Sequence, residues 1–352
     1  MKFPTLPACG LALLLAAGSA AAQSSGGSAS LLIKGASDSR LSLPYQRPHT
    51  DAGTVSGVGA KTLKLQGKSW TIDQFSYNAG GQPETYYALF LDGPLQGVFY
   101  KILSNSPDTL VLDTEGDDLT AHPLGTIAFG NRVHIIPYWR VADVFGDTDV
   151  TVLIDPRTSP LFAADDLLLY DNSASGVNKA PARTLYYRAN AGWRSVDSPL
   201  TSSADTIIPP GSVFTVRRRG VTDLELVNFG VFHKVRRAVY VAGGGTTGND
   251  QFVSLILPEP LTLTESGLGG GVVTSSPSQL IRADEVLLRR SPATGFNNAT
   301  DTTLYYRQGF GWFKVGDSTP IGNTFMLSPG EAIIIRRKAG TAGTDWLQTP
   351  PP

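Results

Sequence analysis

The chain has almost no cysteine. Cys9 is the one cysteine among 352 residues, and it stands in an N-terminal segment that we expect to be removed. The mature chain would then hold no thiol, which excludes disulfides, a cysteine nucleophile and thiolate metal ligands. Histidine is scarce as well, with four residues far apart and none at a His-x-x-x-His spacing, so no metal-site motif is present. These residues are His49, His122, His134 and His233.

Net charge, long apolar runs and catalytic motifs are also missing. The formal charge is −1, which gives no reason to expect nucleic acid as a partner. No apolar run approaches the roughly 20 residues of a membrane-spanning helix, so we expect no transmembrane segment. The sequence contains no Gly-x-Ser-x-Gly elbow, and the glycines of residues 243–248 lack the ending of a phosphate-binding loop. We therefore predict that the protein is not an enzyme and needs no cofactor.

The N-terminus has the pattern of a secretory signal peptide. Lys2 is followed by an apolar run at residues 11–17 and by three alanines at residues 20–22. Small residues after a short apolar run are typical of a cleavage site. We expect cleavage after Ala22 and export to the periplasm, the outer surface or the medium.

Two segments of the chain are nearly the same. The sequence TLYYR occurs at residues 184–188 and again at 303–307, and Gly211 and Gly330 stand at the same offset of 119 positions. A regular offset without gaps indicates an internal duplication, which describes architecture before function.

Short apolar runs separated by turn residues recur along the whole chain. Residues 55–58 and 62–65, for example, alternate in polarity and are joined by a turn, as in a hairpin. We predict an all-β fold of two related β-sandwich or barrel-like units from the duplication, the first carrying an inserted small β-barrel. The expected segments are a signal peptide (1–22), a disordered linker (23–37), the first unit (38–51 and 133–222), the inserted barrel (52–132), the second unit (223–340) and a flexible Pro-rich tail (341–352).

Several motifs carry a family resemblance that covers the mature chain. Together with the twin Tyr-Tyr and Gly-Trp segments, they resemble an uncharacterised family of exported, β-rich, twin-repeat bacterial proteins. The resemblance implies no activity. The motifs are LSLP (41–44), VFYKI (98–102), TLVLD (109–113), GDDL (116–119), IPYW (136–139) and LPEP (257–260).

Residues from about 54 to 136 also resemble a small β-module of phage fibres and bacterial surface proteins. This resemblance implies a spacer or adhesive role. The residues that match the module's pattern are Trp70, Phe75, Gly97, Ile102, Asn105, Thr109, Leu110, Leu112 and Asp113.

The densest group of carboxylates follows residues 109–112. Carboxylate oxygens presented by a turn suit calcium, so a structural calcium ion is one hypothesis for this group. The spacing differs from that of an EF-hand, and a solvated turn after a strand explains it equally well. The residues are Asp113, Glu115, Asp117 and Asp118.

Arginines and aromatics at equivalent places in the twin segments form a second candidate site. Guanidinium groups bind acidic polysaccharide through paired hydrogen bonds, and aromatic faces pack on sugar rings. The alternatives are charged strand ends that discourage edge association and aromatics that build equivalent cores. The candidate ligand-binding residues are Tyr187, Trp193, Arg217, Tyr306, Trp312 and Arg336.

The prediction that follows is an exported, non-enzymatic structural or adhesive protein of the cell surface, envelope or extracellular matrix. Its expected partners are itself or other envelope or matrix components. A polysaccharide-binding protein that uses outward Tyr and Arg residues is the first alternative. A carbohydrate-active enzyme with an unidentified carboxylate pair is the second.

Overall fold

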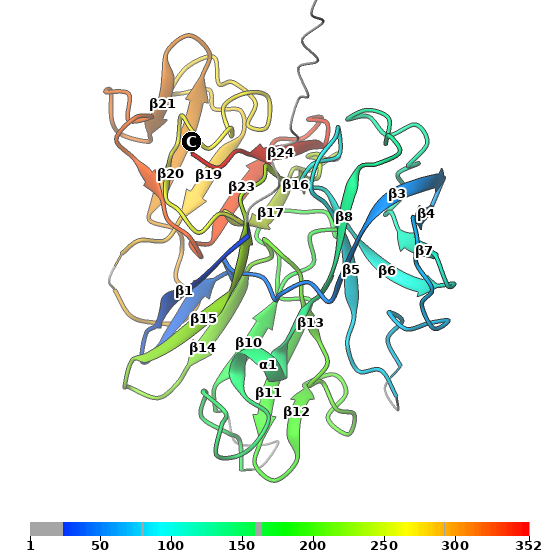
Figure 1. Ribbon diagram of the computed structural model, residues 1–352. Helices are drawn as coiled ribbons and strands as arrows, with labels where there is room; N and C mark the ends of the chain where they lie inside the picture. Colours follow the sequence, from blue (N-terminus) through cyan, green and yellow to red (C-terminus); the bar gives the residue numbers. More distant parts are fainter. Residues whose placement is uncertain (1–23, 79–80, 159–163, 292, 352) are drawn as a thin grey trace, which may run out of the picture.

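The computed structural model describes residues 24–78, 81–158, 164–291 and 293–351. The expected signal peptide lies outside these residues. Within them the chain is built from strands, with one short helix, α1 (Val141–Phe145) (Figure 1). The predicted all-β fold is confirmed.

The first TLYYR segment lies in a five-stranded antiparallel sheet. The order of its strands is β2-β14-β10-β11-β12. Leu167 of β10 lies opposite Leu185 of β11, and Tyr187 lies opposite Trp193. The strands are β2 (Ser37–Leu41), β10 (Asp166–Leu169), β11 (Arg183–Arg188), β12 (Gly192–Ser195) and β14 (Phe214–Arg218).

The second TLYYR segment lies in a sheet of the same construction, ordered β17-β23-β19-β20-β21. Val286 lies opposite Leu304, and Tyr306 opposite Trp312, so these pairs repeat those of the first sheet at the offset of 119 positions. The strands are β17 (Asn249–Val253), β19 (Glu285–Leu288), β20 (Thr302–Arg307), β21 (Gly311–Lys314) and β23 (Ile333–Arg337).

Four strand pairs complete the two units. β1 pairs with β15 and β9 with β13 in the first unit, while β16 pairs with β24 and β18 with β22 in the second. Because β15 pairs with β1, the first unit continues past the predicted boundary at residue 222. The strands are β1 (Ser24–Ile33), β9 (Trp139–Arg140), β13 (Ile207–Ile208), β15 (Leu224–His233), β16 (Arg237–Val241), β18 (Leu261–Thr262), β22 (Met326–Leu327) and β24 (Thr344–Gln348).

Two segments predicted to lack structure are strands. Residues 23–37 were expected to be a disordered linker, but β1 occupies most of them and buries Leu31 and Ile33. Residues 341–352 were expected to be a flexible tail, but β24 pairs with β16 and its Trp346 is fully buried. Both strands are held by partners far away in the sequence, which local composition does not reveal.

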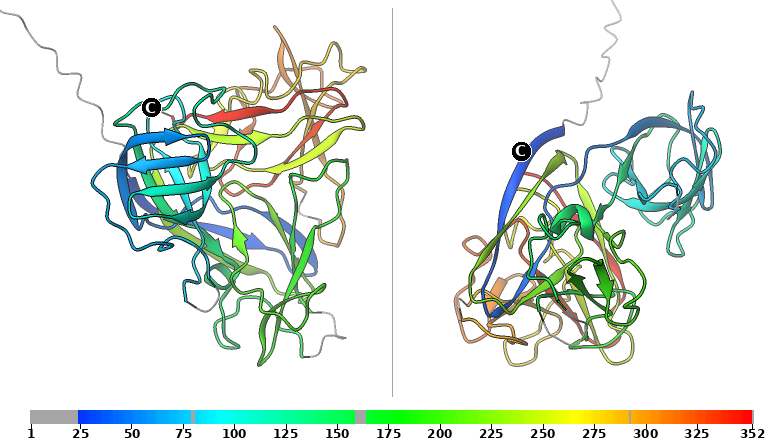
Figure 2. Two further views of the ribbon diagram at one scale, coloured as in Figure 1. Left: turned by 90° about the vertical axis from the view of Figure 1, so that its right-hand side faces the viewer. Right: turned by 90° about the horizontal axis from the view of Figure 1, so that it is seen from below.

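The predicted small barrel is confirmed. Six strands close in the order β3-β4-β7-β6-β5-β8, and Figure 2 shows the barrel beside the two units. It extends to Pro137, five residues past the predicted end, because β8 continues its pairing with β5. The strands are β3 (Asp51–Gly59), β4 (Thr62–Leu65), β5 (Tyr86–Phe90), β6 (Phe99–Asn105), β7 (Thr109–Asp113) and β8 (Arg132–Pro137).

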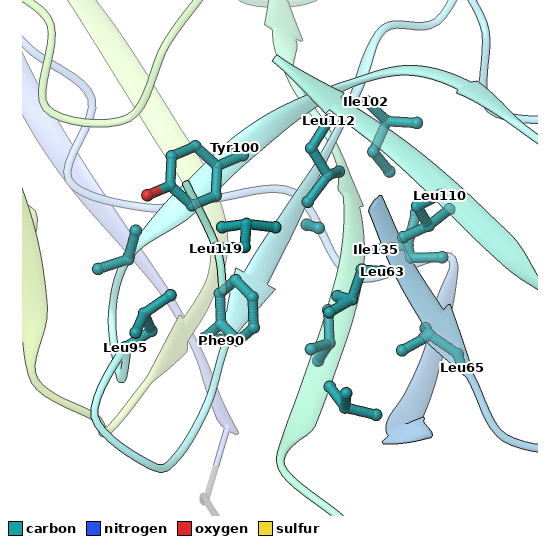
Figure 3. Packing of buried hydrophobic residues seen from close by; sticks show 14 of the residues in the cluster. Leu63, Leu65, Phe90, Leu95, Tyr100, Ile102, Leu110, Leu112, Leu119 and Ile135 are labelled. Atoms are coloured by element: carbon teal, nitrogen blue, oxygen red, sulfur yellow. The ribbon is translucent and has the colours of Figure 1, made fainter. Parts of the chain in front are cut away.

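Alternate residues of the barrel strands fill its interior. Leu63 and Leu65 of β4 face Leu110 and Leu112 of β7, and all four are fully buried (Figure 3). This alternation is the period of two that a half-buried strand requires. The barrel thus has a core built mainly from its own residues, with Ala238 of β16 packed into the same cluster.

A separate apolar cluster joins the two units. Val213, just before β14, packs with Phe252 of β17 and Ile334 of β23. The ring of Tyr170 stacks on that of Phe252, with centroids 4.0 Å apart. The two units therefore share a buried contact.

Candidate functional site

Arg217 is bound by a carboxylate of its own unit and by an amide of the other. Its Nε and Nη2 donate to the two oxygens of Asp38, at 2.8 and 2.9 Å. Nη2 also donates to Oδ1 of Asn297 at 2.6 Å. The backbone N–H of Asn297 donates to Asp38 Oδ2 at 2.7 Å, which closes the group.

Arg336 has the same surroundings with the units exchanged. Its Nε and Nη2 each donate to Asp250 at 2.8 Å, and Nη2 donates to Oδ1 of Asn178 at 2.7 Å. The N–H of Asn178 donates to Asp250 Oδ2 at 2.7 Å. We call these two groups the reciprocal locks, because each unit supplies the asparagine that completes the ion pair of the other.

The electrostatics of the first lock favour a charged carboxylate. Burial raises the pKa of Asp38, but hydrogen bonds from Arg217 and from the Asn297 N–H, with attraction to Arg217 and Arg289, outweigh it. The net result is a pKa below the usual 3.8. Asp38 is thus an anion that Arg217 neutralises at neutral pH.

The arginines predicted to bind polysaccharide are therefore already bound to protein groups. In each lock the fork of the guanidinium is occupied by a carboxylate in the paired geometry that it would offer to a uronic acid. A glycan would have to displace that carboxylate.

Tyr187 and Trp193 lie in the core and do not face outward as the glycan alternative requires. Tyr187 is 2% exposed, Trp193 is fully buried, and Trp193 Nε1 donates to the carbonyl of Gly146 at 2.7 Å. Burial, together with the neighbouring Asp149, raises the pKa of Tyr187 to about 12. The other tyrosine, Tyr186, is covered by the guanidinium of Arg157 at 4.2 Å from its ring centre.

The second unit differs slightly. Trp312 is 2% exposed, and Tyr306 is half-buried against it, with ring centroids 5.4 Å apart. Gly269 lies so close to this pair that a Cβ there would stand 2.9 Å from the Tyr306 ring and 3.2 Å from Trp312 Nε1. The loop after β18 therefore covers much of the predicted stacking surface.

The acidic turn after β7 uses its carboxylates locally. Tyr100 donates to Asp117 at 2.7 Å, and Asp118 accepts bonds from the backbone and hydroxyl of Thr120. Burial raises the pKa of Glu115, and repulsion from Asp113 and Asp117 adds to the shift. A calcium ion at this turn stays a prediction.

The structure assembles a histidine cluster that the spacing of the sequence did not indicate. His49 precedes β3, His134 lies in β8 and His233 ends β15. One ring nitrogen of each lies within 4.8 Å of the others. The ring centroids of His49 and His134 are 4.1 Å apart, and those of His134 and His233 are 4.8 Å apart.

The surroundings keep two of these imidazoles neutral. Burial lowers the pKa of His233 to about 3, helped by the charge of Arg237 and by the other two histidines. Burial likewise lowers the pKa of His134 to about 4, with repulsion from His49 and Arg132. Neutral imidazoles carry lone pairs that accept a proton or a transition metal.

One signal in the sequence pointed toward part of this cluster. His49 and His134 stand near the two ends of the insertion, and an inserted barrel brings its first and last strands together, as the pairing of Ala52 with His134 shows. The place of His233 depends on β15, whose pairing with β1 was not predicted.

Comparison of the chain with protein-family models, with curated proteins and with solved structures finds no match. Within the described residues, no helix has the length and apolar character needed to cross a bilayer.

Proposed function

We propose that this chain is an exported, non-enzymatic structural or adhesive protein of the cell surface, envelope or extracellular matrix. The reciprocal locks carry the proposal. In them, the arginines that a glycan-binding protein would keep free hold the two units together. In the same way, Tyr187 and Trp193 of the first unit pack in its hydrophobic core.

A rigid body without disulfides suits such a role. The two equivalent sheets, related by the offset of 119 positions, support an origin by duplication. Duplication enlarges one scaffold and adds hydrogen-bonded strands, buried cores and ion pairs that resist unfolding in an exposed compartment. The barrel adds a third packed core to the same chain.

An apolar stripe on the β1-β15 ribbon supports an adhesive contact with a second copy of the chain. Leu31 and Leu226 point into the core, so the alternate residues Leu32, Val227 and Phe229 share the outer face. Their exposed fractions are 51%, 52% and 65%. Neighbouring exposed apolar side chains are typical of surfaces that bind other proteins.

Cell fractionation combined with light scattering tests the proposal. We expect the protein in the surface or envelope fraction, and oligomers in solution. Phe229→Lys should shift the oligomers toward monomer without unfolding, because the side chain is exposed. Val150→Lys, at a loop residue that is 94% exposed, is the matched control and should leave the mass unchanged. A monomeric protein found only in the medium would contradict the proposal.

A further inference from the structure

Three imidazoles meet where the barrel joins the first unit. They come from the segment that enters the barrel, from its last strand and from the end of β15. His49 is exposed, His134 half-buried and His233 fully buried, so the cluster reaches from the surface into the interior. Three nitrogen donors this close together form a candidate ligand-binding site.

His233 is the strongest indication of a ligand. Its side chain is 0% exposed, and among the described residues neither ring nitrogen has a hydrogen-bond partner. Nδ1 of His134, in the same cluster, is also buried and has no hydrogen-bond partner in the described part of the chain. A buried polar atom that loses water and gains nothing destabilises the fold, so native proteins nearly always pair such atoms.

We propose that His49, His134 and His233 bind one divalent transition-metal ion of the zinc type. Zinc takes histidine nitrogens at about 2.0–2.1 Å in tetrahedral geometry, which places three such nitrogens about 3.3 Å from one another. The nitrogens now lie within 4.8 Å of one another, so metal binding requires them to move closer, and the exposed His49 has the most freedom to do so. The ion then satisfies one nitrogen of His233.

The donor set decides the class of metal. Three imidazoles, with no carboxylate among the described residues of the cluster, suit zinc, copper or nickel and do not suit calcium or magnesium, which prefer oxygen. The site is thus distinct from the calcium site predicted at the acidic turn. Three protein ligands leave a fourth position open to water or a small anion.

The charge of Arg237 is the main opposing effect. This side chain is 1% exposed, its three nitrogens lack partners within the described residues, and its charge acts on His233. It repels a cation and favours an anion as the fourth ligand. An anion without a metal is the rival occupant, and the comparison of zinc with phosphate described below distinguishes the two.

A metal here would link two segments of the barrel to the first unit. His49 and His134 belong to the entrance and the last strand of the barrel, and His233 to the first unit. Coordination would therefore fix the barrel against that unit without a disulfide. This consequence does not depend on the proposed function.

Isothermal titration of zinc into the untagged full chain, stripped with a chelator, tests the site. We expect one ion per chain and a higher thermal midpoint in the presence of zinc. His49→Ala should keep the fold, because the side chain is exposed, and should weaken binding at least about 100-fold, since loss of even an outer partner of a ligand costs 10–100-fold. His122→Gln is the control and should bind zinc normally, because His122 lies elsewhere, beside Asp117.

A second variant distinguishes loss of zinc binding from loss of folding. His233→Leu fills the same space without polar atoms, so we expect a thermal midpoint at least equal to that of the metal-free protein and no response to zinc. Zinc binding of equal strength in His49→Ala would overturn the proposal. So would a thermal midpoint that rises with phosphate but not with zinc, because the occupant would then be an anion.

Discussion

Asn297 of the second unit accepts a hydrogen bond from Arg217 of the first, at 2.6 Å. Asn178 of the first unit does the same for Arg336 of the second, at 2.7 Å. Both asparagines have positive φ angles, 55° for Asn297 and 52° for Asn178. Asparagine adopts this left-handed conformation more readily than most residues, and it offers an amide oxygen, so one residue type meets both requirements.

Asn297→Gly should destabilise the protein by about 1 kcal/mol. A hydrogen bond to a charged group contributes about 1.5–3 kcal/mol, and partial exposure of Arg217 reduces that value. Glycine keeps the left-handed backbone and the N–H that Asp38 accepts, so the variant isolates the amide side chain. Urea unfolding measures the change.

Asn190→Gly is the matched control for this variant. Asn190 also has a positive φ, 59°, but it is exposed and its side chain has no hydrogen-bond partner within the described residues. Its replacement should change stability by less than about 0.5 kcal/mol. Equal losses in the two variants would show that the lock contributes nothing through Asn297.

The locks should make stability depend on pH in the acid range. The pKa of Asp38 is lower in the folded protein than its usual 3.8, so the unfolded chain takes up a proton first. The stabilisation from this group is present above about pH 4 and is lost as the pH falls through the folded pKa. Urea midpoints at several pH values should fall in this window, and Asp38→Asn should flatten the slope. An unchanged slope would remove Asp38 as its cause.

Truncation should distinguish β24 from the residues that follow it. A chain that ends at Gly340 loses Trp346, which is fully buried, and leaves β16 without its partner. Loss of a buried tryptophan alone costs about 3–5 kcal/mol, a large share of the 5–15 kcal/mol of a typical domain. We expect no cooperative unfolding of the second unit. A chain that ends at Gln348 is the control and should unfold like the intact protein.

Gly97 lies where the barrel contacts the start of β16, and we expect its replacement by alanine to disturb that contact. Its φ is +86°, and a Cβ would stand 2.0 Å from the carbonyl oxygen of Arg236. Gly67 also has a positive φ, +67°, but a Cβ there would meet no atom of the described residues within 4 Å. Gly67→Ala should therefore cost about 1–2 kcal/mol from backbone conformation alone.

Gly97→Ala should cost at least about 2 kcal/mol more than Gly67→Ala, because backbone on both sides of the contact must move. Thermal unfolding of the two variants measures the difference. Similar midpoints would mean that the barrel adjusts its position freely.

The strands with regular alternation were the predictable part of the fold. Leu63 and Leu65 alternate with the polar neighbours Thr62 and Lys64, and local period alone identifies β4. The Ser- and Gly-rich start of β1 carries no such pattern. It is a strand because its backbone pairs with β15, about two hundred positions away.

The candidate sites were predictable only in residue type. Local alternation allowed an outward tyrosine in the first unit, but Arg157, from a separate segment, covers Tyr186, and Tyr187 faces the core. The histidine cluster depends on three segments that meet through long-range pairing. No local period encodes such a meeting, so spacing motifs did not reveal it.

The chain leaves the barrel beside the point where it enters it. Asp51 lies opposite Ile135, and the N–H of Thr50 donates to the carbonyl of Ile135 at 2.8 Å. An exchange of this module for a short loop, or for a different module, would leave the route from β2 to β9 almost unchanged. Protein engineering can therefore replace the module at one point of entry and exit, provided that the replacement still covers Ala238 of β16, which packs into the barrel core.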